Sequence, residues 1–257
     1  MATMKQVVLA AYPQGNPRPE DFRIEDAPVP EPGEGEVLLK TLWLALDPLI
    51  RFAIDEKPLT GITHVALGEV MYGPAVSLVV KSNHPDYAPG DVVEGRTGWR
   101  EYAVVAPDRS DYRGPPRKVD PALAPVQTAL GALGMPGETA YVGMIDTGRV
   151  QAGETVVISA AAGAVGGVAG QIGKLKGARV VGIAGGPEKC AALLEQGFDG
   201  AADYKAPDFA QQLARLVESN ERRLAEVRDT LEVRLGALQR DNATKLEQMR
   251  ATVDEKL

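Results

Sequence analysis

Short hydrophobic runs, separated by clusters of glycine and proline, fill the first 125 residues of the chain. Runs of this kind are typical of the short strands of an antiparallel barrel or sandwich. The strands predicted here are Val7–Tyr12, Glu36–Leu46, Val76–Val80, Val92–Glu94 and Trp99–Val105. Helical spacing then follows from Leu123 to Gly134, and Pro136 with Gly137 predicts a break.

A different pattern begins near Gln151, where buried runs alternate with helical ones. The order is strand, helix, strand, helix, strand, which is the unit of a parallel sheet with right-handed crossovers. The predicted elements are the strand Thr155–Ser159, the helix Val165–Gly177, the strand Ala178–Ala184, the helix Pro187–Gln196 and the strand Gly200–Tyr204. We therefore expect an α/β protein in which three parallel strands follow a β-rich region.

Charged residues dominate positions 214–257, which hold nine of each sign, no proline and no aromatic residue. Apolar residues recur there from Leu224 to Leu257 at steps of three and four, with Asn242 at one seam position. This spacing predicts one long amphipathic, coiled-coil-like helix. An apolar seam of that length needs a partner, so homo-oligomers are expected.

The composition is that of a globular protein, with 44% hydrophobic and 25% charged residues. A net charge of −7 offers no general attraction to nucleic acid or anionic lipid, so neither partner is expected. A single cysteine, Cys190, excludes an internal disulfide, and with two histidines it supplies a metal centre poorly. We expect no metal and a reducing, cytoplasmic location.

The clearest chemical signal is the segment Ala160–Gly166, between a predicted strand and a predicted helix. Glycine at such a turn lets the backbone approach a pyrophosphate, while the next helix offers unpaired N–H groups and the positive end of its dipole. The pattern A-x-x-G-x-x-G is weak alone and informative at a strand-to-helix junction. Gly163, Ala164, Val165 and Gly166 are therefore candidate cofactor-binding residues. An uncharged run around them, mostly alanine and glycine, favours this motif over a membrane helix.

The end of the second parallel strand indicates which dinucleotide would bind. NAD-binding proteins usually carry a carboxylate there for the ribose 2′-hydroxyl, whereas this strand runs into Gly185-Gly186 and then Lys189. A cation at that place suits the 2′-phosphate of NADP(H). The alternatives are a solvated helix lysine for Lys189 and simple packing for Tyr204, which ends the third strand.

Several further motifs resemble those of the zinc-free medium-chain dehydrogenase/reductases. They are Leu46-Asp-Pro48, Gly68-Glu-Val-Met71, Ser82-Asn-His-Pro-Asp86, Gly90-Asp91, Gly98-Trp99 with Glu101-Tyr-Ala103, Gly134-Met-Pro-Gly137 and Thr139-Ala-Tyr141. The branch that these motifs resemble most is that of the prostaglandin (leukotriene B4) reductases and the curcumin-reductase-like NADP-dependent oxidoreductases. The resemblance extends over residues 4 to 213.

This resemblance implies a GroES-like domain, an NADP-binding Rossmann domain, and hydride transfer to the β-carbon of an α,β-unsaturated ketone or aldehyde. It implies that Gly163 to Gly166 hold the pyrophosphate and that Lys189 and Tyr204 contact the 2′-phosphate of NADP(H). Tyr72 and Tyr141 are available to stabilise a developing enolate, but packing is an equal alternative for each. No catalytic residue is assigned.

The domains expected are a GroES-like substrate-side domain (1–125), a partial Rossmann domain (126–213) and the long helix (214–257). Members of the family carry three further Rossmann strands, so the chain is expected to be truncated and its reductase activity impaired. Residues 214–257 resemble the helical region of the DNA recombination protein RmuC family. The alternative function is that of a non-catalytic hybrid chain, which would associate through this helix or through an exposed sheet edge.

Overall fold

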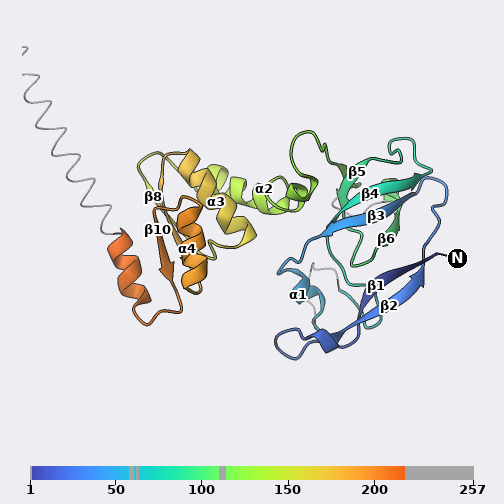
Figure 1. The fold of residues 1–257 in the computed structure, drawn as a ribbon, viewed down its shortest axis with the longest axis horizontal. Helices are drawn as coiled ribbons and strands as arrows, with labels where there is room; N and C mark the ends of the chain where they lie inside the picture. Colours follow the sequence, from blue (N-terminus) through green and yellow to red (C-terminus); the bar gives the residue numbers. More distant parts are fainter. Residues whose placement is uncertain (1, 58–60, 62–63, 110–113, 218–257) are drawn as a thin grey trace, which may run out of the picture. The chain divides into compact units, whose positions relative to one another are not determined.

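The computed structural model describes residues 2–57, 61, 64–109 and 114–217, which form two compact units, Met1–Thr139 and Ala140–Leu257 (Figure 1). The sequence analysis ended the first domain at residue 125. In the structure, the short 3-10 helix η3 (Val126–Leu130) contacts strands β4 (Ala75–Ser82) and β5 (Val92–Gly95) of the first unit. Residues 126–139 therefore lie with the β-rich unit.

The first unit is built from two antiparallel sheets. Strands β1 (Thr3–Leu9) and β2 (Phe22–Pro28) pair with each other, and a five-stranded sheet has the order β6-β3-β4-β5-β7. The remaining strands are β3 (Val37–Leu44), β6 (Tyr102–Val105) and β7 (Arg117–Lys118). Alternate positions on β3, β4 and β5 form one of its cores, with Val37, Leu39, Val79 and Val93 buried. The predicted set of short antiparallel strands is confirmed.

Three local predictions in this unit are wrong. Strand β2 was missed because three of its seven residues are charged and none is buried, which hides the period-two pattern. The predicted helix from Leu123 to Gly134 is only the 3-10 helix η3 with flanking turns, since Pro125 precedes it and Gly131 follows it. The predicted break at Pro136 is the start of helix α2 (Met135–Tyr141), where proline is tolerated because a first-turn N–H has no helical acceptor.

The short helical segments of the first unit connect its strands. They are η1 (Pro19–Asp21), α1 (Ile50–Ala53) and η2 (Pro107–Arg109). Ile50 and Ala53 of α1 are buried in a second hydrophobic cluster, together with Leu9, Ile54 and Met71. The connection between β3 and β4 therefore contributes to the core of this unit.

The second unit contains a parallel three-stranded sheet. Its order is β10-β9-β8, and both pairings are parallel. The elements are η4, a π-helix (Val142–Thr147), β8 (Thr155–Ile158), α3 (Ala164–Leu175), β9 (Arg179–Ala184), α4 (Pro187–Glu195) and β10 (Gly200–Asp203). The predicted strand, helix, strand, helix, strand order is confirmed. The uncharged run that resembles a membrane helix is divided between β8 and α3.

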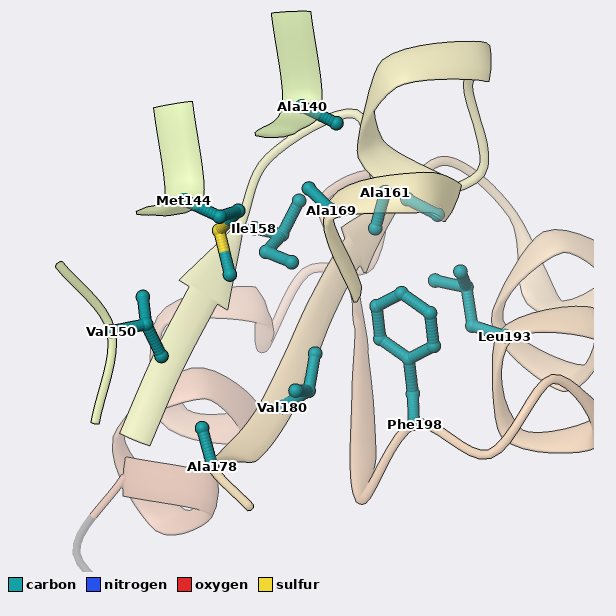
Figure 2. Close-up of a cluster of buried hydrophobic side chains, with 11 residues drawn as sticks. Ala140, Met144, Val150, Ile158, Ala161, Ala169, Ala178, Val180, Leu193 and Phe198 are labelled. Carbon is teal, nitrogen blue, oxygen red and sulfur yellow. The ribbon is translucent and has the colours of Figure 1, made fainter. Parts of the chain in front are cut away.

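Close packing in the second unit depends on small residues. Figure 2 shows the Phe198 ring beside Leu193, with Ala161, Ala169 and Val180 in the same buried cluster. A Cβ on Gly170 of α3 would overlap the Phe198 ring. Glycine in α3 therefore sets how closely the helix approaches the sheet.

A final helical segment spans residues 209–217 and contacts the sheet. The Arg179 Nη1 donates a hydrogen bond to the Leu216 carbonyl over 2.9 Å. The predicted amphipathic helix, its apolar seam and the RmuC-like resemblance fall almost wholly on residues 218–257, which lie outside the described residues. They stay predictions.

Candidate functional site

The glycine-rich turn follows β8 at the carboxyl edge of the parallel sheet. Ala160 adopts a positive φ of 48°, a left-handed conformation that is costly for a residue with a Cβ. The Ala161 N–H donates to the Ile183 carbonyl of β9 over 3.0 Å, and the Gly163 N–H donates to the Ala160 carbonyl over 2.8 Å. These bonds hold the turn against the end of the neighbouring strand.

Gly166 and Gly173 allow two different close contacts. A Cβ on Gly166 would lie 2.5 Å from the Ala160 carbonyl oxygen and 2.7 Å from the Ala161 Cα, so only glycine lets the helix start this close to the turn. A Cβ on Gly173 would lie 2.9 Å from the Val180 side chain, so Gly173 permits close packing of helix on strand. Both glycines therefore allow close approach of backbone and side chains between the turn, α3 and β9.

The first turn of α3 presents its backbone to solvent. Gly163 is the N-cap residue and provides no side-chain cap. Ala164 and Val165, the first two helical residues, are exposed, whereas Gly166 is buried. First-turn N–H groups have no acceptor within the helix, and the dipole favours an anion there by about 0.3–1 kcal/mol. Contact of Gly163, Ala164, Val165 and Gly166 with a pyrophosphate stays a prediction.

Lys189 lies in the first turn of α4, which begins directly after β9. Gly186 is the N-cap of this helix and has φ +100° and ψ 152°, a conformation that essentially only glycine adopts. The Lys189 side chain is exposed. Because β8 and β9 are parallel, the α4 N-terminus and the glycine turn lie at the same edge of the sheet. Convergence of the Lys189 ammonium with the turn amides stays a prediction.

Tyr204 follows β10 and covers the turn after β9. Its N–H donates to the Ala184 carbonyl over 3.0 Å. A Cβ on Gly185 would lie 2.7 Å from the Tyr204 ring, so the ring rests on the bare Cα of Gly185. The ring remains 56% exposed. The Tyr204 ring thus packs against Gly185 and is still partly exposed, so part of it is available to a ligand.

Asp203 is a member of this edge that the sequence analysis missed. Its Oδ1 accepts hydrogen bonds from the N–H groups of Gly186, at 2.8 Å, and Lys205, at 2.9 Å. The N–H of Gly186, followed by that of Lys205, lowers the pKa of this carboxyl. The sequence argument counted only the residues of β9 itself, whereas the neighbouring strand brings a carboxylate to the same tip.

A separate cavity of about 620 Å³ lies within the first unit. Tyr72, Arg96 and Arg117 line it together with the carboxyl groups of Asp47 and Glu94. The Arg96 guanidinium lies 5.0 Å from the centre of the Tyr72 ring, and Arg117 Nε is 3.6 Å from Glu94 Oε2. Burial raises the pKa of both carboxyl groups, and nearby arginines oppose the rise. Charged side chains of both signs therefore line one cavity.

The two tyrosines considered as enolate stabilisers belong to different units. Tyr72 is half-buried and lines the cavity, whereas Tyr141 ends α2 and is 55% exposed. The residues described contain no group of three metal-ligating side chains that could hold a metal ion. In the same part of the chain, every helix is too short or too polar to cross a bilayer.

Comparison with known proteins relates the chain to a group of reductases. Residues 5–111 match a family described as the N-terminal domain of oxidoreductase. The chain is 50% identical over 209 residues to the NADPH-dependent curcumin reductase of Escherichia coli, an alignment that includes 81% of this chain and 59% of the relative. It is 38% identical over 214 residues to prostaglandin reductase 1 of Sus scrofa, with 82% and 61% covered.

A solved structure and a plant reductase are also similar to this chain. The structure of CurA from Vibrio vulnificus in complex with NADPH matches with a TM-score of 0.76 and 41% identity, covering 84% of this chain and 62% of that one. A 2-alkenal reductase (NADP(+)-dependent) of Nicotiana tabacum is 38% identical over 206 residues, covering 78% of this chain and 58% of the relative. The chain spans about three fifths of the length of the curated relatives it matches.

Proposed function

We propose that the chain binds NADP(H) at the carboxyl edge of β8, β9 and β10, as a relative of the curcumin reductases and prostaglandin reductases that its sequence resembles. The protein would be an oxidoreductase that reduces the carbon–carbon double bond of α,β-unsaturated ketones or aldehydes. The observation that carries the proposal is the glycine turn, which is bonded to the end of β9 and leads into the exposed first-turn residues Ala164 and Val165 of α3.

Two parts of the edge fit two parts of the cofactor. The exposed amides of Ala164 and Val165, at the positive end of the α3 dipole, suit the pyrophosphate. The exposed Lys189 and the half-exposed ring of Tyr204 suit the 2′-phosphate and the adenosine. A Cβ on Gly163 would lie 3.1 Å from the Ala160 carbonyl oxygen, so glycine at this position keeps the turn tight.

When bound, the reduced nicotinamide supplies a hydride for the β-carbon of the substrate. The residues of this chain bind and orient: the turn fixes the pyrophosphate, and the α4 N-terminus fixes the adenosine end. Hydride transfer demands close alignment, because a displacement of about 1 Å can lower the rate on the order of 100-fold. No residue of the chain is assigned as a proton donor.

The cavity of the first unit is proposed to hold an uncharged part of the substrate. Tyr72 offers an aromatic wall, and Arg96 and Arg117 line the cavity with the carboxyl groups of Asp47, Glu94 and Glu138, so no excess positive charge remains to attract an anionic group. We predict that Tyr72→Ala raises KM for an aromatic enone several-fold and leaves the dissociation constant of NADPH unchanged. Steady-state kinetics beside a cofactor titration measures both. A change in NADPH affinity with no change in KM would contradict this role.

The alternative is a non-catalytic chain that forms homo-oligomers through its C-terminal segment or through the edge of β8. That edge carries Val157, which is 42% exposed, and an unpaired strand edge is a site of association. Light scattering of the full chain at tens of micromolar distinguishes the two. A strict monomer that consumes NADPH only when an enone is present supports the reductase, and a stable oligomer without turnover supports the alternative.

Cofactor binding is tested by thermal unfolding with NADPH and with NADH. We expect NADPH to raise the melting temperature more, because binding to the folded state alone stabilises it. Lys189→Glu should abolish the preference. Lys176→Glu makes the same charge change at the C-cap of α3 and should retain it. Equal responses of the unaltered chain to both dinucleotides would contradict the 2′-phosphate assignment.

A further inference from the structure

Asp203 connects the ends of two strands at the proposed adenosine pocket. Its Oδ1 accepts two backbone hydrogen bonds, one from Gly186 in the turn after β9 and one from Lys205 in the turn after β10. Hydrogen bonds to a charged acceptor are among the stronger ones in proteins. One carboxylate oxygen therefore connects the turn after β9 with the turn after β10. The donor Gly186 and the acceptor Asp203 are 17 residues apart in the sequence.

The turn that Asp203 holds is conformationally demanding. Gly186 has φ +100° and starts α4, so its orientation sets the direction of the first turn of that helix and of Lys189 within it. Gly185 lies under the Tyr204 ring, whose contact requires the glycine Cα to stay in place. The backbone on both sides of the Asp203 bonds thus carries the two side chains proposed to contact the 2′-phosphate.

We propose that Asp203 is a positioning residue for cofactor selectivity: it fixes the Gly185–Gly186 turn so that Lys189 and Tyr204 together accept a 2′-phosphate. Asp203 acts through the turn, because its Oδ1 is engaged by two backbone donors. A carboxylate at a strand tip can bind a ribose hydroxyl. Here the Asp203 carboxylate instead binds the backbone N–H groups of Gly186 and Lys205. This inference rests on the proposed NADP(H) site.

A matched control lies at the other end of the same strand. Asp199 immediately precedes β10, and its Oδ2 accepts a hydrogen bond from the Val180 N–H over 2.7 Å. It also contacts Lys174 Nζ at 2.7 Å. Asp199 and Asp203 thus bracket β10 with similar backbone bonds, but only Asp203 is at the carboxyl edge. Asp199→Ala should destabilise the sheet without touching the cofactor pocket.

The experiment compares the full-length chain with Asp203→Ala, Asp203→Asn and Asp199→Ala, by calorimetric titration with NADP⁺ and with NAD⁺ and by thermal unfolding. Asp203→Ala should weaken NADP⁺ binding on the order of 10-fold, the worth of one misplaced charged hydrogen bond, and should change NAD⁺ binding much less. Asp203→Asn, which keeps an acceptor oxygen, should lie between Asp203→Ala and the unaltered chain. Asp199→Ala should lower the melting temperature and keep the selectivity.

The outcomes separate this inference from the function on which it rests. If the unaltered chain prefers NADP⁺ and Asp203→Ala keeps that preference, or weakens both dinucleotides equally, the positioning role is wrong while the NADP(H) site stands. Tighter NADP⁺ binding by Asp203→Ala would show that the carboxylate repels the phosphate, which also overturns it. If the unaltered chain shows no preference, the proposed 2′-phosphate site is itself wrong and the inference fails with it.

Discussion

The candidate sites of the two units are built differently, one from side chains and one mostly from backbone. The first unit packs valine and leucine side chains between antiparallel strands, and its cavity is lined by the side chains of Tyr72 and Arg96 and by the partly buried carboxyl groups of Asp47 and Glu94. The second unit packs small residues closely, and its functional edge is mostly backbone: the turn at Gly163 and the turn at Gly186. Side-chain substitution should therefore alter the first site gradually, whereas a single methyl group can destroy the second.

Two adjacent glycines in α3 provide the largest expected effect. Gly166→Ala places a Cβ 2.5 Å from a backbone oxygen that cannot move aside, so we expect a loss of about 1–3 kcal/mol of unfolding free energy together with weaker NADPH binding. Gly167→Ala meets nothing nearer than 3.7 Å and should be neutral or stabilise the helix by up to about 1 kcal/mol. Urea unfolding of both variants makes the comparison, and equal stabilities would contradict the backbone account.

Carboxyl groups in the two units should respond oppositely to pH. Burial raises the pKa of Asp47 in the first unit, so its ionised form is penalised in the folded state. Burial also acts on Asp199, but the Lys174 ammonium and the Val180 N–H lower the pKa of that carboxyl overall. Ionisation of Asp199 therefore stabilises the fold above its unfolded pKa, and this contribution is lost as pH falls through the lower folded value.

We accordingly expect Asp199→Asn to be less stable than the unaltered chain at neutral pH, with the difference disappearing in acid. Asp47→Asn should be equal to or more stable than the unaltered chain at neutral pH, with that difference also disappearing in acid. Unfolding measured between about pH 2 and pH 7 tests both signs. A neutral-pH loss of stability in Asp47→Asn would show that Arg96 outweighs burial at that carboxyl.

The smallest expected effect is on the thiol of Cys190. Burial, and then the charge of Asp203, raise the pKa of this thiol, so alkylation should be slow near neutral pH. Asp203→Asn removes one of the two causes and should accelerate alkylation by about two- to three-fold. Mass spectrometry of iodoacetamide labelling follows the rate. An unchanged rate would show that the charge of Asp203 does not act on the Cys190 thiol.

Regular patterns in the sequence predicted most of the second unit, because a parallel sheet buries its strands and ends them at glycine turns. β8, β9 and β10 each follow from short apolar runs, and the Gly163 turn follows from its place between strand and helix. The first unit was less predictable where polar pairing replaces burial. β2 pairs fully with β1 although Arg23, Glu25 and Asp26 lie along it, and no period-two apolar pattern marks it.

The candidate site shows the same limit. Gly163, Lys189 and Tyr204 could be chosen from local position alone, since each follows the end of a predicted strand. Asp203 could not, because its importance depends on pairing between β9 and β10, which brings its carboxylate to the Gly186 N–H. Likewise, the close contact of Gly185 with the Tyr204 ring arises from tertiary packing, so it could not be predicted from the two residue types.

In the proposed site, the α3 amides and the α4 N-terminus hold one phosphorylated adenosine. The most direct test is an NMR titration of the ¹⁵N-labelled full chain with adenosine 2′,5′-bisphosphate, following the amides of Gly163, Ala164 and Val165 together with those of Gly186 and Lys189. The account predicts that both sets shift along one common saturation curve, and that adenosine 5′-monophosphate moves the second set much less. Shifts confined to one set, or two sets that saturate at different concentrations, would contradict it.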